Sequence, residues 1–296
     1  MSHHLPVRRT GLRRAVALAA AMALFLGVTA AGVSAAGPAS KADLLYAKGV
    51  DHPAGHGQGK PTANLTWHGG AILNSTVVQA VFWGTSWGSP GDKISGLDKF
   101  YGGVGGSPYM NSNTEYTGTN GTVGAGVNYS GHFVDSSAGP TNAPSTSTIQ
   151  AEVAKEITSP VPNGYYPVYI DLKRGNAGYC AWHSYGTVHG VPVQFGFFFN
   201  LDGDPGCDPA DAGTAHSQGL EALANVSGHE LSETVTDPRN GGWWDKTGEE
   251  NADKCAWTFS GTVKIGSDQW KIQGNWSNTA NNKKSGYDHA GCIETR

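Results

Sequence analysis

The sequence has few charged residues and only one long apolar run, which lies at its N-terminus. Asp, Glu, Lys and Arg make up 15% of the 296 residues, whereas there are 43 glycines, nine tryptophans and eleven tyrosines. A disordered chain would lack these aromatic residues. The composition therefore excludes a disordered protein and favours a loop-rich, β-containing, extracellular globular protein. Without a second apolar run, we expect no membrane association after loss of the N-terminal segment.

Cysteines are also few. Only four are present, and none has Cys-x-x-Cys spacing, which argues against a four-thiolate zinc site. In an exported protein an even number of cysteines predicts disulfides, with three possible connectivities. We favour Cys180–Cys207 and Cys255–Cys292, because local pairing closes the shorter loops.

Residues 1–35 have the features of an export signal. Four arginines between positions 8 and 14 precede an apolar run at 15–31, and small residues follow at 33–36. We expect a signal peptide over 1–35 and a secreted protein, exported by the Sec route in preference to the twin-arginine route. Loss of four arginines and no acids changes the formal net charge from −4 to −8. A mildly acidic protein argues against nucleic acid or an anionic membrane as its partner.

The remaining sequence predicts one α+β domain at 63–296, after a flexible, Gly- and Pro-rich lead-in at 36–62. Apolar runs and periodicity predict strands at 77–84, within 115–134, at 165–172 and at 191–199, and a hairpin across 262–273. Helices are expected at 92–101, 148–157 and 217–235, the second capped by Ser147 or Thr148. This order predicts a mixed, largely central β-sheet flanked by helices, with a long zincin-like helix and an irregular C-terminal part.

The long predicted helix carries a His-Glu-x-x-Glu motif at residues 229–233. His229 and Glu233 are four residues apart and therefore share one helix face, which Asp237 extends before Pro238 ends the helix. Glu230 follows His229 as the catalytic glutamate follows the first histidine of His-Glu-x-x-His metalloproteases. Glu233 replaces the second histidine, and because carboxylates also bind zinc the site is altered but not excluded.

A metal-dependent hydrolase needs about three protein ligands, an open position for water and a nearby carboxylate. We expect His229 and Glu233 as ligands and Glu230 as the general base. The remaining ligands are sought among Asp237, Asp245, Glu250, Asp253, His183 and His189. Zinc is favoured, although an oxygen-rich set also suits calcium or manganese. The alternative is a chance occurrence of a short motif on a solvated helix face.

Several short segments, in order over residues 65–296, carry a resemblance to a known family. They are Trp67–Gly70, Val81–Gly84, Tyr179–Tyr185, Gly228–Pro238, Gly242–Asp245, Glu250–Cys255 and Trp276–Asn278. Together they resemble the phosphate-induced-protein (EXORDIUM-like) family in its bacterial secreted branch. The resemblance implies a secreted or cell-wall-associated protein and no firmly assigned reaction. Some plant relatives lack the histidine and glutamate of the motif, which implies that the fold does not need the site. One extra residue before Asp253 leaves open whether Glu249 or Glu250 matches the family pattern.

Three functions remain compatible with these features. The first is a secreted metal-dependent hydrolase, peptidase-like, that acts on an extracellular peptide. The second is a non-catalytic extracellular protein that binds cell-wall glycan or another surface ligand, because the nine tryptophans supply faces that stack on sugars. The third is a structural metal site without turnover, in which chelation would lower thermal stability. In each case we expect a monomer.

Overall fold

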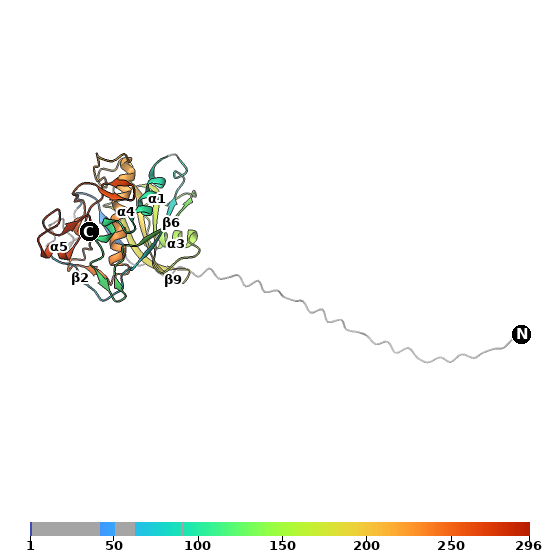
Figure 1. Ribbon diagram of the computed structural model, residues 1–296. Coiled ribbons are helices and arrows are strands. Elements are labelled where there is room, and N and C mark those ends of the chain that lie inside the picture. Colours follow the sequence, from blue (N-terminus) through green and yellow to red (C-terminus); the bar gives the residue numbers. More distant parts are fainter. Residues whose placement is uncertain (2–41, 51–62, 90) are drawn as a thin grey trace. The chain divides into compact units, whose positions relative to one another are not determined.

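The computed structural model describes residue 1 and residues 42–50, 63–89 and 91–296 (Figure 1). The expected signal peptide, apart from Met1, and most of the expected lead-in lie outside the described residues. No helix within the described ranges is both long and apolar enough to cross a membrane. The residues from Ala42 onward belong to one structural unit.

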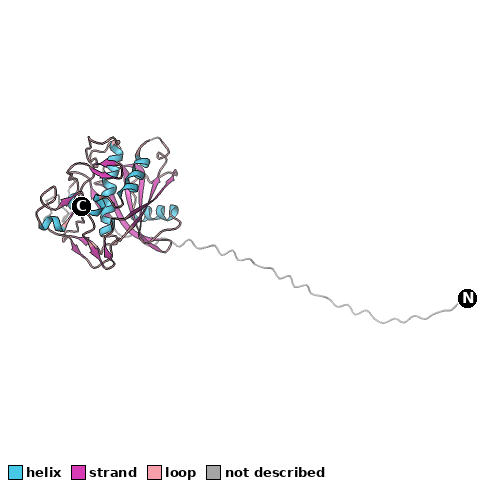
Figure 2. Ribbon diagram, viewed as in Figure 1, coloured by secondary structure: helices cyan, strands magenta, loops and turns pink. Residues whose placement is uncertain are grey.

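A six-stranded mixed sheet lies at the centre of this unit, in the order β1-β8-β9-β7-β3-β6 (Figure 2). Its strands are β1 (Asp43–Tyr46), β3 (Thr76–Trp83), β6 (Val127–Asp135), β7 (Gly164–Lys173), β8 (Tyr179–Val188) and β9 (Val191–Asn200). Strands β9, β7, β3 and β6 are parallel to one another. Strand β8 is antiparallel to β9, and β1 is antiparallel to β8. The central strands β7 and β9 are buried on both faces, which is typical of parallel strands covered by helices.

Helices cover both faces of the sheet. They are α1 (Lys93–Val104) and α4 (Gln218–Thr236) on one face and α3 (Thr146–Glu156) on the other. Tyr169 of β7 points from the first face toward both helices. Its hydroxyl hydrogen-bonds to Tyr101 of α1 at 2.9 Å and to Ser227 of α4 at 2.7 Å. On β8, Gly186 lies against α3, whereas His183 contacts α4. Three positions separate these two residues, so they point to opposite faces of the strand.

Short elements complete the fold. Paired strands are β2 (Thr66–Trp67) with β10 (Trp243–Trp244), β4 (Thr117–Gly118) with β5 (Gly121–Thr122), β11 (Val263–Ile265) with β12 (Asp268–Trp270), and β13 (Asn275–Trp276) with β14 (Cys292–Ile293). The short helices are α2 (Pro108–Asn111), the 3-10 turn η1 (Asp253–Cys255) and α5 (Asn278–Asn282). The expected C-terminal hairpin is the β11–β12 pair.

The mixed helix and strand content agrees with the α+β prediction, and the predicted long elements are present within a few residues. Two strands differ from expectation. The sequence did not predict β8, and β1 lies inside the expected flexible lead-in. That expectation is wrong for Asp43–Tyr46, because these residues pair with β8 along the sheet edge. The cap of α3 is also different: Ser145, and neither Ser147 nor Thr148, accepts the hydrogen bond from the backbone of Thr148.

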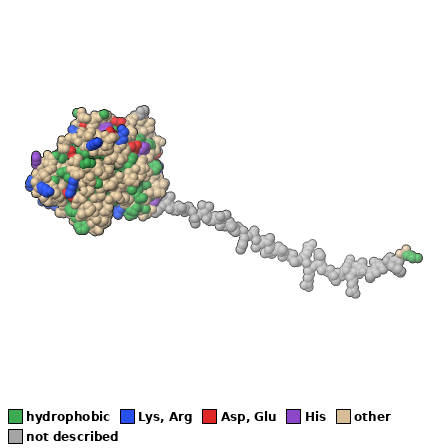
Figure 3. All heavy atoms as spheres, in the orientation of Figure 1, with side chains coloured by type: hydrophobic (Ala, Val, Ile, Leu, Met, Phe, Trp, Pro, Cys, Tyr) green, Lys and Arg blue, Asp and Glu red, His purple; other side chains and the backbone are tan. Residues whose placement is uncertain are grey.

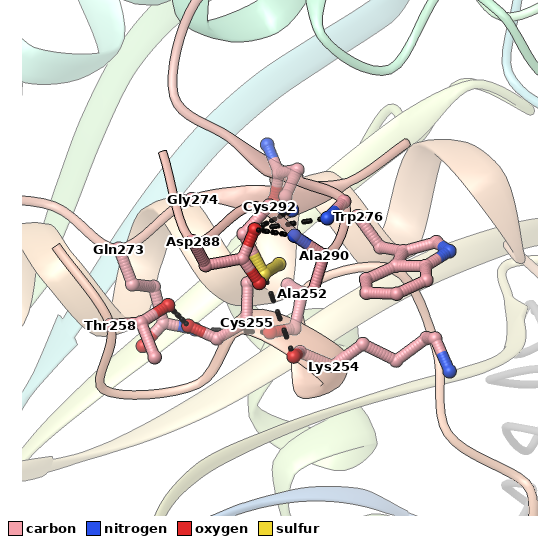
Figure 4. The surroundings of a disulfide bond; sticks show 12 residues. Ala252, Lys254, Cys255, Thr258, Gln273, Gly274, Trp276, Asp288, Ala290 and Cys292 are labelled. Carbon is pink, nitrogen blue, oxygen red and sulfur yellow. Dashed lines mark hydrogen bonds between the residues drawn. A yellow bond between two sulfur atoms is a disulfide. The ribbon is translucent and has the colours of Figure 1, made fainter. Parts of the chain in front are cut away.

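Both favoured disulfides are confirmed. Cys180–Cys207 joins β8 to the loop that follows β9, and Cys255–Cys292 joins two distant points of residues 243–296, here called the C-terminal region. Figure 4 shows that Gln273, Trp276 and Asp288 surround the second disulfide. This region contains little regular structure, and it packs against α4 on the side away from the sheet.

Candidate metal centre

Helix α4 is buried along almost its whole length. The hydroxyl of Ser217 caps its N-terminus by accepting a hydrogen bond from the backbone of Leu220, and all residues from Gly219 to Thr236 are buried. The sheet covers one side of the helix and the C-terminal region covers the other. The alternative of a solvated helix face is therefore wrong, since His229 and Glu233 are at most 1% exposed.

Every fourth residue of α4 and its cap is polar, and these residues form a line that we call the polar stripe: Glu221, Asn225, His229, Glu233 and Asp237. Glu221, Asn225 and Glu233 accept hydrogen bonds from backbone N–H groups of the C-terminal region, at 3.2, 2.8 and 3.0 Å. Asp237 accepts two more, from the consecutive glycines at 241 and 242, both at 2.8 Å. The stripe therefore supplies acceptors to individual backbone amides of a region with little regular structure, and to the two glycine amides that precede it.

Glu230 lies one residue beyond the stripe and points toward β8. Its Oε2 is 3.1 Å from Nδ1 of His183, and Oε2 of Glu233 is 3.5 Å from the same nitrogen. The other ring nitrogen of His183, Nε2, lies 3.4 Å from Oε2 of Glu250. His183, Glu230 and Glu233 are all buried and each offers a ligand atom within 4.8 Å of the others, so they form the first possible metal-binding group.

A second group shares Glu233 with the first. Nε2 of His229 is 3.0 Å from Oε1 of Glu233 and 3.4 Å from Oδ1 of Asp253. Ligand atoms of His229, Glu233 and Asp253 also lie within 4.8 Å of one another. One oxygen of Glu233 thus faces His229, and its other oxygen faces His183. Bond lengths of about 2.0–2.2 Å place tetrahedral zinc ligands roughly 3.3–3.6 Å apart, so both groups have suitable spacing.

The cluster has buried polar atoms that the described part of the protein does not satisfy. Oε1 of Glu230, both carboxylate oxygens of Glu250 and Nε2 of His229 have no hydrogen-bond partner there. Glu230 and Glu250 are at most 1% exposed. Because an unpaired buried carboxylate is costly, the arrangement fits a bound cation. Groups of this composition also occur without an ion, so the residues permit metal binding without requiring it.

Burial and neighbouring charges shift the pKa values of the cluster in opposite directions. Burial raises the pKa of Glu230 to about 7, and burial together with Asp43 raises the pKa of Glu250 well above its usual value. Burial also acts to raise the pKa of Glu233, but His229 and His183 lower it to about 2. For His183, burial acts to lower the pKa, but Glu230 and Glu233 raise it well above the usual value. The two histidines thus favour the ionised form of Glu233, and the two glutamates favour the protonated form of His183.

A pocket of about 270 Å³ adjoins the cluster. Four acids line it, together with uncharged residues: Asp43, Asp237, Glu250 and Asp253, then Ala42, Leu44, Tyr46, Asn240, Trp244 and Gly248. Asp43 reaches this position because β1 pairs with β8 and places it opposite His183. Burial and the charge of Asp253 raise the pKa of Asp43 to about 7. The pocket would therefore favour cationic groups, and it gives access to Glu250 and Asp253.

The structure brings together most of the predicted site residues. His229, Glu233, Glu250 and Asp253 belong to the cluster, and Asp237 lines the pocket while binding its glycine amides. Glu230 is buried against His183 and is not among the residues that line the pocket.

The remaining candidates differ in their contacts. His183 joins the cluster, but His189 lies on an exposed turn, where its ring contacts the carbonyl of Ala154 at 2.7 Å. Asp245 forms an ion pair with Nζ of Lys254 at 2.7 Å. Of the two adjacent glutamates, Glu250 is the one that approaches His183.

Two residues of the site were not predicted. Asp43 precedes a short apolar run in a segment without periodicity, so only its pairing with β8 identifies it. Gln273 lies in the C-terminal region, and its Nε2 is 2.5 Å from Nδ1 of His229. Neither residue has a sequence signal that relates it to a motif more than 40 positions away.

No protein-family model and no curated protein matches the chain, so the resemblance to the EXORDIUM-like family rests on the residues quoted for it and stays a prediction.

Proposed function

We propose that the protein is a secreted, metal-dependent hydrolase of the peptidase-like kind, with a divalent ion bound around Glu233. The observation that supports this most is the set of buried, unpartnered atoms on Glu230, Glu250 and His229 next to an acid-lined pocket. Two histidines favour zinc, whereas the number of carboxylates also suits manganese or calcium. The position of the motif on a long helix under the sheet supports the zincin-like interpretation of α4.

The residues available to hold the ion are His183, His229, Glu230, Glu233 and Asp253. A divalent ion at such a site lowers the pKa of a bound water and polarises a substrate carbonyl. Glu250 lines the pocket and has a raised pKa, so it can accept and return a proton there. We assign the general acid–base role to Glu250 in preference to Glu230, because Glu250 lines the pocket and Glu230 does not.

Secretion is part of the proposal. Two disulfides are typical of proteins that fold in an oxidising compartment. The N-terminal features and the EXORDIUM-like resemblance support the same location. The acidic pocket favours a substrate that presents a positively charged group, such as a peptide with a free amine.

Elemental analysis of the mature protein, combined with thermal melts in a chelator, tests the proposal. We expect bound zinc or manganese, a lower Tm after chelation, and hydrolysis of a mixed peptide library. Glu250→Gln should abolish hydrolysis while the protein still binds metal. A folded protein that binds no divalent ion, and whose Tm does not respond to chelator, would contradict the proposal. Metal retention without hydrolysis of any peptide would instead support the structural metal site.

A second candidate function is glycan binding. Trp67 is 45% exposed, and the neighbouring His68 stacks on Trp244 with ring centroids 3.2 Å apart. Trp244 also lines the pocket, so an aromatic surface borders the acidic one. On the face in view in Figure 3, charged side chains are scattered among larger areas of uncharged atoms. Retention on insoluble glycan that Trp67→Ala abolishes and His229→Ala preserves would favour this function over hydrolysis.

A further inference from the structure

The two histidines of the cluster differ in what holds their second ring nitrogen. Nδ1 of His229 lies 2.5 Å from the amide nitrogen of Gln273. The orientation of that amide is fixed by a second contact, because its Oε1 accepts a hydrogen bond from the backbone N–H of Trp257 at 3.1 Å. With the amide so oriented, Gln273 donates and Nδ1 of His229 must accept.

The tautomer of His229 follows from this contact. When Nδ1 accepts, the neutral ring carries its proton on Nε2. Nε2 faces Glu233 at 3.0 Å and Asp253 at 3.4 Å, and both carboxylates favour a proton at this position. A nitrogen that holds a proton has no lone pair for a metal ion. His229 therefore resembles the other members of the polar stripe, which position the C-terminal region against α4.

His183 has the opposite arrangement. Its Nδ1 faces two carboxylates, those of Glu230 and Glu233, while Nε2 faces Oε2 of Glu250 at 3.4 Å. Metal-binding histidines usually direct their other ring N–H at a carboxylate or carbonyl, which fixes the tautomer that leaves a lone pair for the metal. Glu250 is the carboxylate that faces this second nitrogen. Oε1 of Glu230, which has no partner among the described residues, completes the set of available donor atoms.

We propose that His183, Glu230 and Glu233 are the metal ligands, and that His229 is a positioning residue whose protonated Nε2 lies beside Glu233 and does not bind the metal. The proposal rests on the proposed metal binding and changes which residues perform it. It makes Glu230 a ligand, and it places the key histidine on β8, outside the His-Glu-x-x-Glu motif. The ligand set of one histidine and two carboxylates leaves further coordination positions for water or substrate.

Cobalt(II) provides the probe, because each histidine that binds it gives one strongly shifted imidazole N–H resonance by proton NMR. We expect one such resonance in the wild-type protein. It should persist in His229→Gln, whose side-chain amide also carries N–H groups and no metal-binding nitrogen, and it should be absent in His183→Gln. By titration calorimetry, His183→Gln should weaken cobalt binding by more than about 100-fold. His229→Gln should weaken it by about 10-fold or less, the lower end for residues that support ligands. Circular dichroism spectra and thermal melts of both variants check that each one folds.

Gln273→Glu provides an independent variant with nearly the same shape. Glutamate accepts a hydrogen bond from Nδ1–H of His229 and so frees Nε2 to bind metal. We expect a second shifted imidazole resonance in this variant. Two resonances in the wild type, or loss of the resonance in His229→Gln but not in His183→Gln, would overturn the ligand assignment and leave the proposed function standing. A wild-type protein that binds no cobalt would contradict the proposed function itself.

Discussion

The two sides of α4 are buried by different means. On the sheet side, aromatic rings pack face to face: Tyr169 stacks between Phe82 and Phe198, with centroids 5.0 and 4.6 Å apart. On the other side, the C-terminal region binds the polar stripe through backbone amides and is closed by the Cys255–Cys292 disulfide. Figure 1 shows regular strands on the first side and mostly loops on the second.

This difference separates two ways of fixing a chain in one conformation. The apolar side gains stability in proportion to buried area and does not require a particular geometry at each atom. The polar side depends on individual hydrogen bonds, each of which leaves a buried group unsatisfied when it is lost. The cluster lies where the two sides meet, because Glu230 and Glu233 contact His183 of the sheet whereas His229 contacts the C-terminal region.

The largest expected effect is on the apolar side. Phe198→Ala removes a fully buried ring from the stack with Tyr169 and leaves a cavity. We expect the free energy of unfolding to fall by about 4 kcal/mol, measured by urea denaturation. Phe198→Leu is the matched control and should cost well under half as much. Equal losses in the two variants would show that this side depends on specific ring contacts and not on buried area.

The free energy of unfolding should fall by about 3 kcal/mol when Cys255→Ala and Cys292→Ala together remove the disulfide of the C-terminal region. The bond closes a sequence separation of 37 residues, and the cross-link restricts the unfolded chain. Removal of Cys180–Cys207, which spans 27 residues, is the control and should give a similar loss. Hydrogen exchange should accelerate mainly within residues 243–296 in the first variant. Acceleration spread evenly through the sheet would remove the distinction between the two sides.

The same difference explains how much of the structure the sequence predicted. On the apolar side, continuous apolar runs such as Val77–Trp83 and Val191–Phe199 identify strands, because burial on both faces requires them. β8 escaped prediction because it carries His183 and Ser184 among apolar residues, and both are buried in the folded protein. β1 is too short for periodicity to be detected.

The sequence could group only those site residues that lie close together along the chain. His229, Glu230 and Glu233 could be grouped because four residues make about one helical turn. Glu250 and Asp253 were identified as acids near the motif, but their contacts depend on how an irregular segment folds back onto α4. Asp43 and Gln273 come from opposite ends of the domain, and only the strand pairing and the packing of the C-terminal region bring them to the cluster.

A buried ion pair should make the polar side sensitive to acid. Burial acts to raise the pKa of Asp245, but the hydrogen bond and charge of Lys254 lower it below the value of 3.8 for an ordinary aspartate. A lowered folded-state pKa adds stability that is fully present above that ordinary value and is lost as the pH falls toward the folded pKa.

Asp245→Asn should remove this acid-dependent contribution and lower the free energy of unfolding by about 2 kcal/mol at pH 7, because the Lys254 ammonium then has a neutral amide in place of its carboxylate partner. Denaturant unfolding at pH 7, 5 and 3 measures both effects. The stability difference between wild type and variant should shrink between pH 5 and pH 3. A difference that is constant over this range would show that the Asp245 charge does not stabilise the C-terminal region.

The smallest expected effect is at the start of α4. Ser217→Ala removes the oxygen that accepts from the backbone of Leu220, and a lost N-cap costs about 1 kcal/mol. Ser145→Ala, which removes the equivalent cap of α3, is the matched control. The hydroxyl of Ser217 also donates to the carboxylate of Asp92 at 2.7 Å, whereas the side-chain partners of Ser145 are neutral hydroxyls. We therefore expect the Ser217 variant to lose more stability than the Ser145 variant in urea denaturation. The reverse order would show that α4 is held by its packing on both sides and depends little on its own terminus.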